Sequence, residues 1–214
     1  AALSDQLQTS LQALALPLSA AQQQSLLDYL ALLAKWNKVY NLTAVREPES
    51  MLRLHLLDSL AALPPLLRHC AGQPTRLLDV GSGGGLPGVA FAIAAPELLR
   101  VSCVDTVAKK ARFIAQVGAE LGLKNLIAEH ARVEQLERPP FAVITSRAFA
   151  SLVDFVTLTR QLLAPAGVWM ALKGQHPAEE IAALPVDVEV FHVEQLQVPG
   201  LDAQRCIVWM RPRG

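Results

Sequence analysis

Residues 77–88 read Leu-Leu-Asp-Val-Gly-Ser-Gly-Gly-Gly-Leu-Pro-Gly, and this stretch decides the fold. An apolar run ends in an acid, Asp79, and a turn that holds five of the chain's 12 glycines leads into a second apolar run. Glycine reaches backbone conformations closed to other residues and lets another molecule approach the main chain. A glycine turn between a parallel strand and its helix is where nucleotide-like ligands bind in doubly wound sheets. An ordinary tight turn needs fewer glycines, so the stretch favours a ligand-binding loop.

Two classes of ligand fit this loop by pattern alone. Gly83-x-Gly85-x-x-Gly88 matches the dinucleotide fingerprint, so a NAD(P)-dependent oxidoreductase is one alternative. The carboxylate of Asp79 would repel a pyrophosphate, and Pro87 removes one N–H donor from the start of the helix. S-adenosylmethionine has no phosphate and carries a sulfonium and an ammonium group, which favour a nearby acid. Asp79 therefore favours S-adenosylmethionine as the cofactor.

The next apolar run, residues 99–104, is also followed by an acid, Asp105. Its distance from the glycine loop is about that at which a carboxylate binds ribose hydroxyls in nucleotide-binding units. Because a helix is expected directly afterwards, Asp105 has a second reading as a helix N-cap. We expect Asp105 to bind the ribose of the cofactor.

Length, composition and charge limit the classes of protein that fit. The 214 residues, 52% of them hydrophobic, suit one α/β domain with a helical appendage. Three widely spaced cysteines and five histidines show neither disulfide nor metal-ligand spacing, which favours a reducing cytoplasm and no metal. We expect a cytoplasmic monomer with no membrane partner.

The formal net charge of zero counts against a large surface that coats nucleic acid. It leaves room for small basic patches, although each basic cluster can also be read as a solvated face. The clusters are Lys35 with Lys38, Lys109 and Lys110 with Arg112, and Arg205 with Arg211 and Arg213.

The first part of the chain predicts a helical cap over residues 1–66. Leucines recur at helical spacing up to Pro17, and Ser19 begins a capping-box arrangement. The second helix extends to about Trp36, which we expect to anchor the cap rather than to stack on a base. A third helix covers about residues 49–63 and stops at the two prolines that follow.

Residues 67–214 alternate strand and helix, which predicts a mainly parallel sheet. Two β runs at the end, residues 186–198 and 204–211, predict an antiparallel hairpin. Such a hairpin closing a parallel sheet is typical of the class I, Rossmann-like, S-adenosylmethionine-dependent methyltransferase fold of the α/β class. The other expected strands are 76–80, 99–104, 126–129, 141–145 and 167–173, and the expected helices between them are about 87–95, 107–121, 132–136 and 151–163.

Seven segments of the chain, in this order, resemble one family. They are Asn37, residues 40–46 (Tyr-Asn-Leu-Thr-Ala-Val-Arg), 55–59 (His-Leu-Leu-Asp-Ser), 79–88, 146–150 (Ser-Arg-Ala-Phe-Ala), 172–174 (Leu-Lys-Gly) and 198–201 (Val-Pro-Gly-Leu). Over nearly its whole length the chain is similar to the bacterial ribosomal RNA small subunit methyltransferase G family, also called glucose-inhibited division protein B. The resemblance implies methyl transfer from S-adenosylmethionine to N7 of a guanine in 16S rRNA, in the small ribosomal subunit or its precursor. A non-catalytic RNA-binding assembly factor with the same fold is a further alternative.

The resemblance also implies contacts to the cofactor. Gly81 and Leu86 match the family's contacts in the loop, and Val133 and Glu134 match its contact near the adenine. Arg147 matches the family's arginine after the fourth strand. Together with the residues inferred from the loop, the expected cofactor site is Asp79, Gly81, Gly83, Gly85, Leu86, Asp105, Val133, Glu134 and Arg147.

The segment after the fourth strand is expected beside the methyl group, because ligands bind outside the carboxyl ends of the strands. It has no cysteine for cytosine C5 methylation, no Asp/Asn-Pro-Pro-aromatic turn and no base. Guanine N7 has a free lone pair and needs orientation alone. Arg147 is the candidate that holds the guanine edge or a phosphate, with a salt bridge to Asp105, Glu134 or the cofactor carboxylate as the alternative.

Two further candidates complete the expected catalytic set with Arg147. Lys173 ends the fifth strand on the ligand side, where it could contact a phosphate. His55 and Asp58 lie on one helix face, where they either orient a loop over the cofactor or cap neighbouring backbone.

Overall fold

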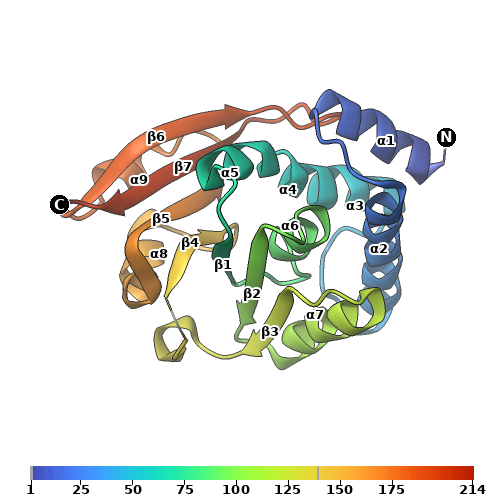
Figure 1. The fold of residues 1–214 in the computed structure, drawn as a ribbon, viewed down its shortest axis with the longest axis horizontal. Helices are drawn as coiled ribbons and strands as arrows, with labels where there is room; N and C mark the ends of the chain where they lie inside the picture. Colours follow the sequence, from blue (N-terminus) through green and yellow to red (C-terminus); the bar gives the residue numbers. More distant parts are fainter. Residues whose placement is uncertain (1, 139) are drawn as a thin grey trace.

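A central sheet organises the molecule, whose computed structural model describes residues 2–138 and 140–214. Within these residues the sheet has seven strands in the order β3-β2-β1-β4-β5-β7-β6 (Figure 1). Strands β1 to β5 are parallel, and β7 pairs antiparallel with both β5 and β6. This arrangement confirms the expected methyltransferase fold with its C-terminal hairpin. The strands are β1 Thr75–Val80, β2 Leu99–Asp105, β3 Leu126–His130, β4 Phe141–Ser146, β5 Leu163–Lys173, β6 Val188–Leu196 and β7 Arg205–Pro212.

The strand order reverses between β1 and β4. From β1 the chain proceeds outward through β2 to β3, and then returns to place β4 on the other side of β1. Because ligands of open α/β sheets bind where the order reverses, outside the carboxyl ends of the strands, this is the expected position of the site. The glycine loop follows β1 there, and the segment that begins with Arg147 follows β4.

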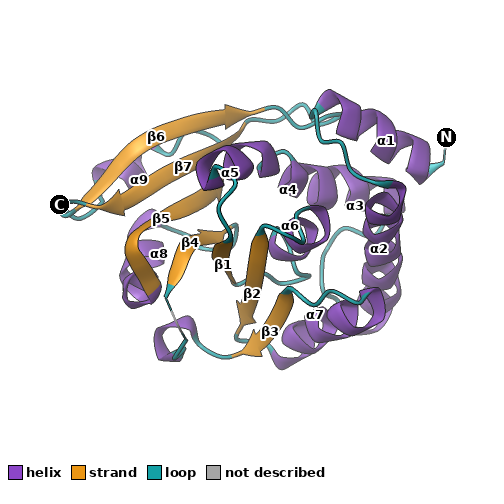
Figure 2. Ribbon diagram, in the orientation of Figure 1, coloured by secondary structure: helices purple, strands orange, loops and turns teal. Residues whose placement is uncertain are grey.

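Helices cover both faces of the sheet (Figure 2). Leu77 of β1 belongs to a hydrophobic cluster with the N-terminal helices, α6 and α7, whereas its neighbour Leu78 packs in a second cluster with α8. Successive side chains of a strand point to opposite faces, so the adjacent buried leucines show that β1 is covered on both sides. The helices of the sheet region are α6 Gly88–Ala94, α7 Ala108–Leu121, α8 Leu152–Thr159 and α9 Ala178–Ala182, with 3-10 turns at Val133–Gln135 and Arg160–Leu162.

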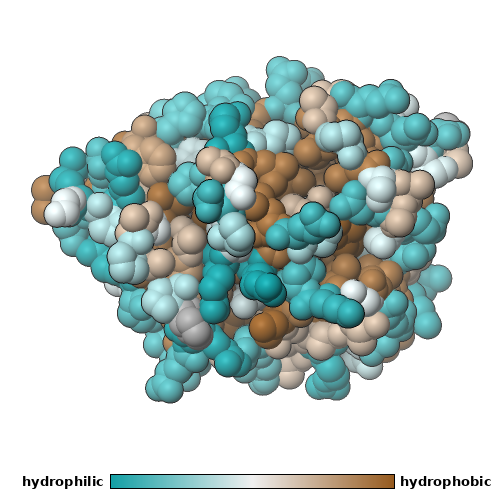
Figure 3. Space-filling view, in the orientation of Figure 1, coloured by the Kyte–Doolittle hydropathy of each residue, from teal (hydrophilic) through white to brown (hydrophobic). Residues whose placement is uncertain are grey.

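The N-terminal helices form a cap over one face. They are α1 Leu3–Ala13, α2 Ala20–Tyr40, α3 Pro48–Met51, a π-helical turn η1 at Leu52–Leu57, α4 Asp58–Leu60 and α5 Leu63–Cys70. Leu26 and Leu33 of α2 are fully buried in the same cluster as Phe113 of α7. On the face drawn in Figure 3, hydrophilic residues surround hydrophobic ones that gather toward the middle.

Details of the cap both confirm and correct the sequence prediction. The capping box forms, since the Ser19 hydroxyl accepts from the Gln22 backbone N–H and the Gln22 side chain accepts from the Ser19 N–H. The prediction of a single third helix was wrong, because the π-helical turn η1 interrupts it. The prolines that were expected to end it instead begin α5, since a proline in the first helical turn removes an N–H that has no partner in the helix. As a result α5 runs across the expected boundary at residue 66.

Three further elements differ from expectation. The expected helix 132–136 is a 3-10 turn, and the helix expected to continue to residue 163 ends at Thr159, where a 3-10 turn leads into β5. The short helix α9 was not expected. No described helix has the length and hydrophobicity that crossing a membrane requires.

Candidate functional site

The glycine loop turns sharply at the carboxyl end of β1. Gly81 and Gly85 have φ angles of 68° and 100°, a region that side chains disfavour. A Cβ on Gly85 would lie 2.6 Å from Val89 Cγ2, and one on Gly81 would lie 3.1 Å from Ala148 Cβ. Gly85 thus allows the loop to pack on α6, and Gly81 allows it to approach the segment after β4.

Asp79 lies beneath this loop and has no exposed surface. Its Oδ2 accepts a 2.7 Å hydrogen bond from the Gly88 N–H, and its Oδ1 has no partner among the described residues. Burial raises the pKa of Asp79 to about 7, opposed by the Gly88 N–H and by Arg147. Asp79 therefore holds the start of α6 in place and does not line the cavity described below.

Asp105 also holds the loop. Its Oδ2 accepts from the Gly83 N–H at 2.9 Å, and its Oδ1 accepts from the Val107 N–H at 2.8 Å. The second bond closes a turn just before α7, whose N-cap residue is Val107, so the alternative reading of Asp105 as the N-cap was wrong. Each carboxylate oxygen can accept a further hydrogen bond, so a ribose contact is compatible with both bonds.

A cavity of about 470 Å³ opens between the glycine loop, the ends of β4 and β5, and the cap. It unites six of the expected residues: Gly81, Gly83, Leu86, Arg147, Lys173 and His55. The other expected residues, Asp79, Gly85, Asp105, Val133 and Glu134, do not line it, and of these Val133 is buried whereas Glu134 is exposed beyond β3. Sequence reasoning missed several lining residues, among them Leu33, Thr43, Arg205 and Cys206.

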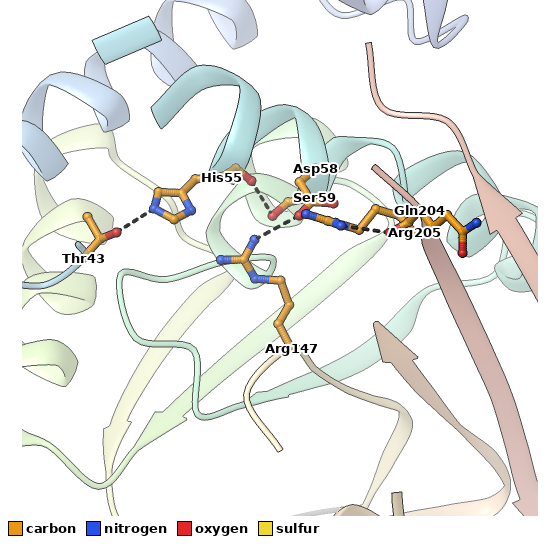
Figure 4. A network of polar contacts seen from close by, with 7 residues as sticks. All are labelled: Thr43, His55, Asp58, Ser59, Arg147, Gln204 and Arg205. Carbon is orange, nitrogen blue, oxygen red and sulfur yellow. Dashed lines mark hydrogen bonds and ion pairs between the residues drawn. The ribbon is translucent and has the colours of Figure 1, made fainter. Parts of the chain in front are cut away.

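Arg147 faces the cap across the cavity (Figure 4). Its Nη1 lies 3.9 Å from Oδ2 of Asp58, and the same oxygen accepts a 3.1 Å hydrogen bond from Nε of Arg205. Asp105 and Glu134, two of the partners considered from sequence, were therefore wrong, since the partner within the protein is Asp58. The cap brings Asp58 to this position from 89 residues earlier in the chain, a contact that local sequence spacing does not reveal.

His55 lies in the π-helical turn and holds the loop that follows α2. Its Nε2 shares a 2.6 Å hydrogen bond with Oγ1 of Thr43, and its buried Nδ1 has no partner in the described structure. Burial, and next the nearby Arg147, lower the pKa of His55, so its imidazole is neutral at pH 7. Of the two readings of His55, its contacts agree with the one in which it orients a loop. Single π-helical turns are frequent at functional sites.

Lys173 contacts the segment after β4 and the helix α9. Its Nζ donates to the Phe149 carbonyl at 3.2 Å and lies 3.0 Å from Oε1 of Glu180. Glu180 also accepts from the Leu152 N–H at 3.0 Å, at the start of α8. Lys173 thus holds the segment that carries Arg147, and this role differs from the expected phosphate contact.

Tyr29 joins the cap to the glycine loop and was not among the expected residues. Its fully buried hydroxyl donates a 2.6 Å hydrogen bond to the Gly84 carbonyl. The only signal in the sequence is a tyrosine within a helical stripe of leucines, where a buried hydroxyl requires a partner.

The cavity suits binding and orientation better than proton transfer or nucleophilic attack. Arg147, Arg205 and Lys173 provide positive charge, and His55 is neutral and hydrogen-bonded to Thr43. Burial raises the pKa of the Cys206 thiol, which disfavours a thiolate. No cluster of metal ligands occurs in the part of the chain that the structure describes.

Comparisons with known proteins agree with this geometry. The family model described as rRNA small subunit methyltransferase G matches residues 22–208. A protein named ribosomal RNA small subunit methyltransferase G from Methylibium petroleiphilum is 65% identical to this chain, over 100% of this chain and 96% of its own. A protein of the same name from Leptothrix cholodnii is 64% identical, over 98% of this chain and 95% of its own. The O-methyltransferase TomG from Streptomyces achromogenes, solved in complex with S-adenosylmethionine, shares the fold with a TM-score of 0.59 at 18% identity, over 97% of this chain and 96% of its own.

Proposed function

Because the chain belongs to the rRNA small subunit methyltransferase G family, we propose that it transfers a methyl group from S-adenosylmethionine to N7 of a guanine in 16S rRNA. One observation supports this function above the others. The glycine loop and two arginines, Arg147 and Arg205, meet at one cavity where the strand order reverses. Such a cavity can hold an adenosyl compound and a nucleotide side by side.

The glycine loop fits the methyl donor. S-adenosylmethionine, when bound, supplies an activated methyl group on a sulfonium. The backbone of Gly81 and Gly83 lines the cavity, and Leu86 adds apolar surface. Tyr29 and Asp105 hold this loop from the cap side and from β2, which fixes its shape before any ligand arrives.

The residues that line the cavity fit a methyl acceptor whose reacting atom carries no proton. Guanine N7 attacks through a lone pair, so the enzyme needs to orient it and needs no general base. Orientation of two reactants can lower a barrier by about 7–11 kcal/mol in favourable cases. The neutral, hydrogen-bonded His55 and the protonated Cys206 agree with this chemistry.

Arg147 and Arg205 are the residues that bind the substrate. A guanidinium can donate paired hydrogen bonds to guanine O6 or to a phosphate. Asp58 lies between both side chains and positions them over the cavity. Bound through O6, a guanine leaves N7 free to react.

The remaining candidates have supporting roles in this proposal. His55 and Lys173 position the segments that close the cavity, through Thr43 and Phe149 respectively. Asp105 binds the ribose, as its distance from the glycine loop suggests. The residues after β3, Val133 and Glu134, contact the adenine, as the family resemblance implies. Asp79 holds the start of α6 beneath the loop, and Gly85, within the loop, allows it to pack on α6.

We further propose a cytoplasmic monomer in which the cap and the sheet fold as one unit. The shared hydrophobic cluster of α1, α2, α6 and α7 supports a single unit. The three cysteines are free and buried, which suits a reducing compartment.

Two measurements test the function. S-adenosylhomocysteine should raise the melting temperature, whereas NADH should not, because a ligand stabilises the folded protein that binds it. Tritiated methyl groups should then pass to 16S rRNA transcribed in vitro or to small subunits that lack the modification. Stabilisation by NADH alone would favour an oxidoreductase, and RNA binding without methyl transfer would favour an assembly factor.

A further inference from the structure

We propose that a basic and aromatic surface at the end of α2 and the start of α7 binds the RNA strand that flanks the nucleotide in the cavity. The inference rests on the proposed function and adds a second contact area for the same substrate. This surface, called here the α2–α7 surface, consists of Lys35, Lys38, Tyr40, Lys109, Lys110 and Arg112.

The two helices run in opposite directions. Gln22 near the start of α2 donates to the carbonyls of Ile93 and Ala94 at the end of α6, and Tyr29 reaches Gly84 just before α6 begins. Since α6 leaves the carboxyl end of β1, α2 runs toward that edge of the sheet. Helix α7 begins after β2 at the same edge and runs away from it. We infer that the end of α2 and the start of α7 lie together; the two helices contact each other and are neighbours in Figure 1.

An aromatic contact fixes how the two helices are aligned. The rings of Trp36 and Phe113 pack with centroids 5.5 Å apart. Tyr40 is one turn beyond Trp36, and Lys109 is one turn before Phe113, so in antiparallel helices they lie at the same level. Both are at the edge of the sheet where the cavity opens.

The surface is continuous with the cavity. Leu33 lines the cavity, and Tyr40 is seven residues later on the same face of α2, about 10 Å along the helix. Leu42 and Thr43, which follow directly, line the cavity as well. A strand whose target base enters the cavity would thus have its neighbouring nucleotides near Tyr40.

The charged residues of the α2–α7 surface are all positive. Residues 35–46 and 106–116 contain six lysines and arginines and no acid. None of the five cations of the α2–α7 surface has an ion pair among the described residues. Lys109 and Lys110 lie in the first turn of α7, where the helix dipole disfavours cations. Their placement opposes helix stability, so it favours an anionic partner over a merely solvated face.

Tyr40 adds a flat, partly exposed ring to this charge. Its ring packs on that of Trp36 at 5.3 Å, and Trp36 packs in turn on Phe113. The neighbouring Val39 is 71% exposed. A ring held from beneath and open above can stack on a base of any sequence, while lysines beside it contact phosphates. Cations together with a stacking ring fit single-stranded RNA.

Three variants of the α2–α7 surface test the proposal: the double substitution Lys38→Gln with Lys109→Gln, Tyr40→Ala, and the conservative Tyr40→Phe. Lys124→Gln is the matched control, because Lys124 is exposed and lies beyond the other end of α7. Each variant is first checked for its melting temperature and for its affinity for S-adenosylhomocysteine, and both should equal those of the unsubstituted protein.

Affinity for a 16S rRNA fragment is then measured across a salt series, together with the KM and kcat of methyl transfer. The double variant and Tyr40→Ala should each raise the dissociation constant and the KM by about fivefold or more with little change in kcat. In the double variant, the slope of the logarithm of affinity against the logarithm of salt concentration should also become shallower, by the equivalent of about one phosphate contact or more. Tyr40→Phe and Lys124→Gln should leave RNA binding unchanged.

The proposal would be overturned by unchanged RNA affinity in the double variant and in Tyr40→Ala, or by an equal loss in Lys124→Gln. Cross-linking of Tyr40 to a ribosomal protein rather than to RNA would also overturn it. Failure of the unsubstituted protein to methylate any rRNA would contradict the proposed function instead, so the two failures can be told apart.

Discussion

The carboxylate of Asp58 lies 3.9 Å from the guanidinium of Arg147, and this ion pair joins the cap to the segment after β4. The same carboxylate accepts a hydrogen bond from Arg205 at the end of the sheet. Three parts of the chain that are far apart in sequence thus meet at one oxygen (Figure 4). Asp58 sets the position of both arginines, so its loss should affect catalysis more than stability.

Asp58→Asn should lower kcat/KM for 16S rRNA by about tenfold, since the arginines lose their charged partner. The free energy of unfolding should change by less than about 1 kcal/mol, because these side chains are partly exposed. Glu194→Gln is the control, since it removes the ion pair of Glu194 with the exposed Arg68, away from the cavity. Equal activity of Asp58→Asn and the control would refute the positioning role.

Arg147→Ala should abolish methyl transfer, lowering kcat/KM by about a hundredfold or more, because it removes paired hydrogen bonds to the substrate. Arg147→Lys should restore little of this activity, since an ammonium group cannot form the same pair of hydrogen bonds. Affinity for S-adenosylhomocysteine, measured by calorimetry, should stay within a few fold. Transfer near the normal rate in Arg147→Ala would show that Arg147 does not hold the substrate.

Tyr29→Phe tests the contact between the cap and the glycine loop. The change removes the hydroxyl that donates to the Gly84 carbonyl and leaves the ring in place. The loss should cost about 1 kcal/mol of stability, because the partly buried carbonyl is left without this donor. Affinity for S-adenosylhomocysteine should also fall, since the loop is less well held. Denaturant unfolding and calorimetry measure the two effects, and an unchanged affinity would separate Tyr29 from the ligand site.

The buried Asp79 should make stability depend on pH. In the folded protein its pKa is about 7, whereas the ordinary value of 3.8 applies to the unfolded chain. Between these values the folded state binds more protons, so stability should fall as pH rises from about 4 to about 7. One pKa unit is worth about 1.4 kcal/mol, so a difference of about 3 units contributes on the order of 4 kcal/mol.

Asp79→Asn should flatten this part of the pH profile, because an amide keeps the shape and does not titrate. The comparison is made between the two proteins at each pH, since His55, whose pKa is lowered, contributes with the opposite sign below its ordinary pKa of 6.5. Parallel profiles for the two proteins would show that Asp79 does not titrate in this range.

Much of the fold follows from local sequence. The glycine loop, the alternation of strands and helices, and the capping box at Ser19 are short-range patterns with direct physical causes, and each is present in the structure. The π-helical turn and the start of α5 were not predicted, because the same residues also fit a regular helix that ends at a proline.

The sequence predicts which loops form the site, but it does not predict the side-chain contacts within the site. Gly81, Leu86 and Arg147 follow the ends of β1 and β4, so their meeting at the cavity follows from the topology. The partner of Arg147 and the role of Lys173 depend on where the cap and α9 pack, which sequence spacing does not encode. The same holds for Tyr29, whose hydroxyl finds its partner 55 residues later.

The most direct measurement of the central claim is the identity of the methylated atom. Unmodified 16S rRNA is incubated with the protein and S-adenosylmethionine, digested to nucleosides and analysed by mass spectrometry, and the modified site is mapped by borohydride and aniline cleavage, which detects N7-methylguanosine. One cleavage site that disappears with Arg147→Ala is the expected result. A methyl group on another base or another atom, or the absence of any methyl transfer, would contradict the account.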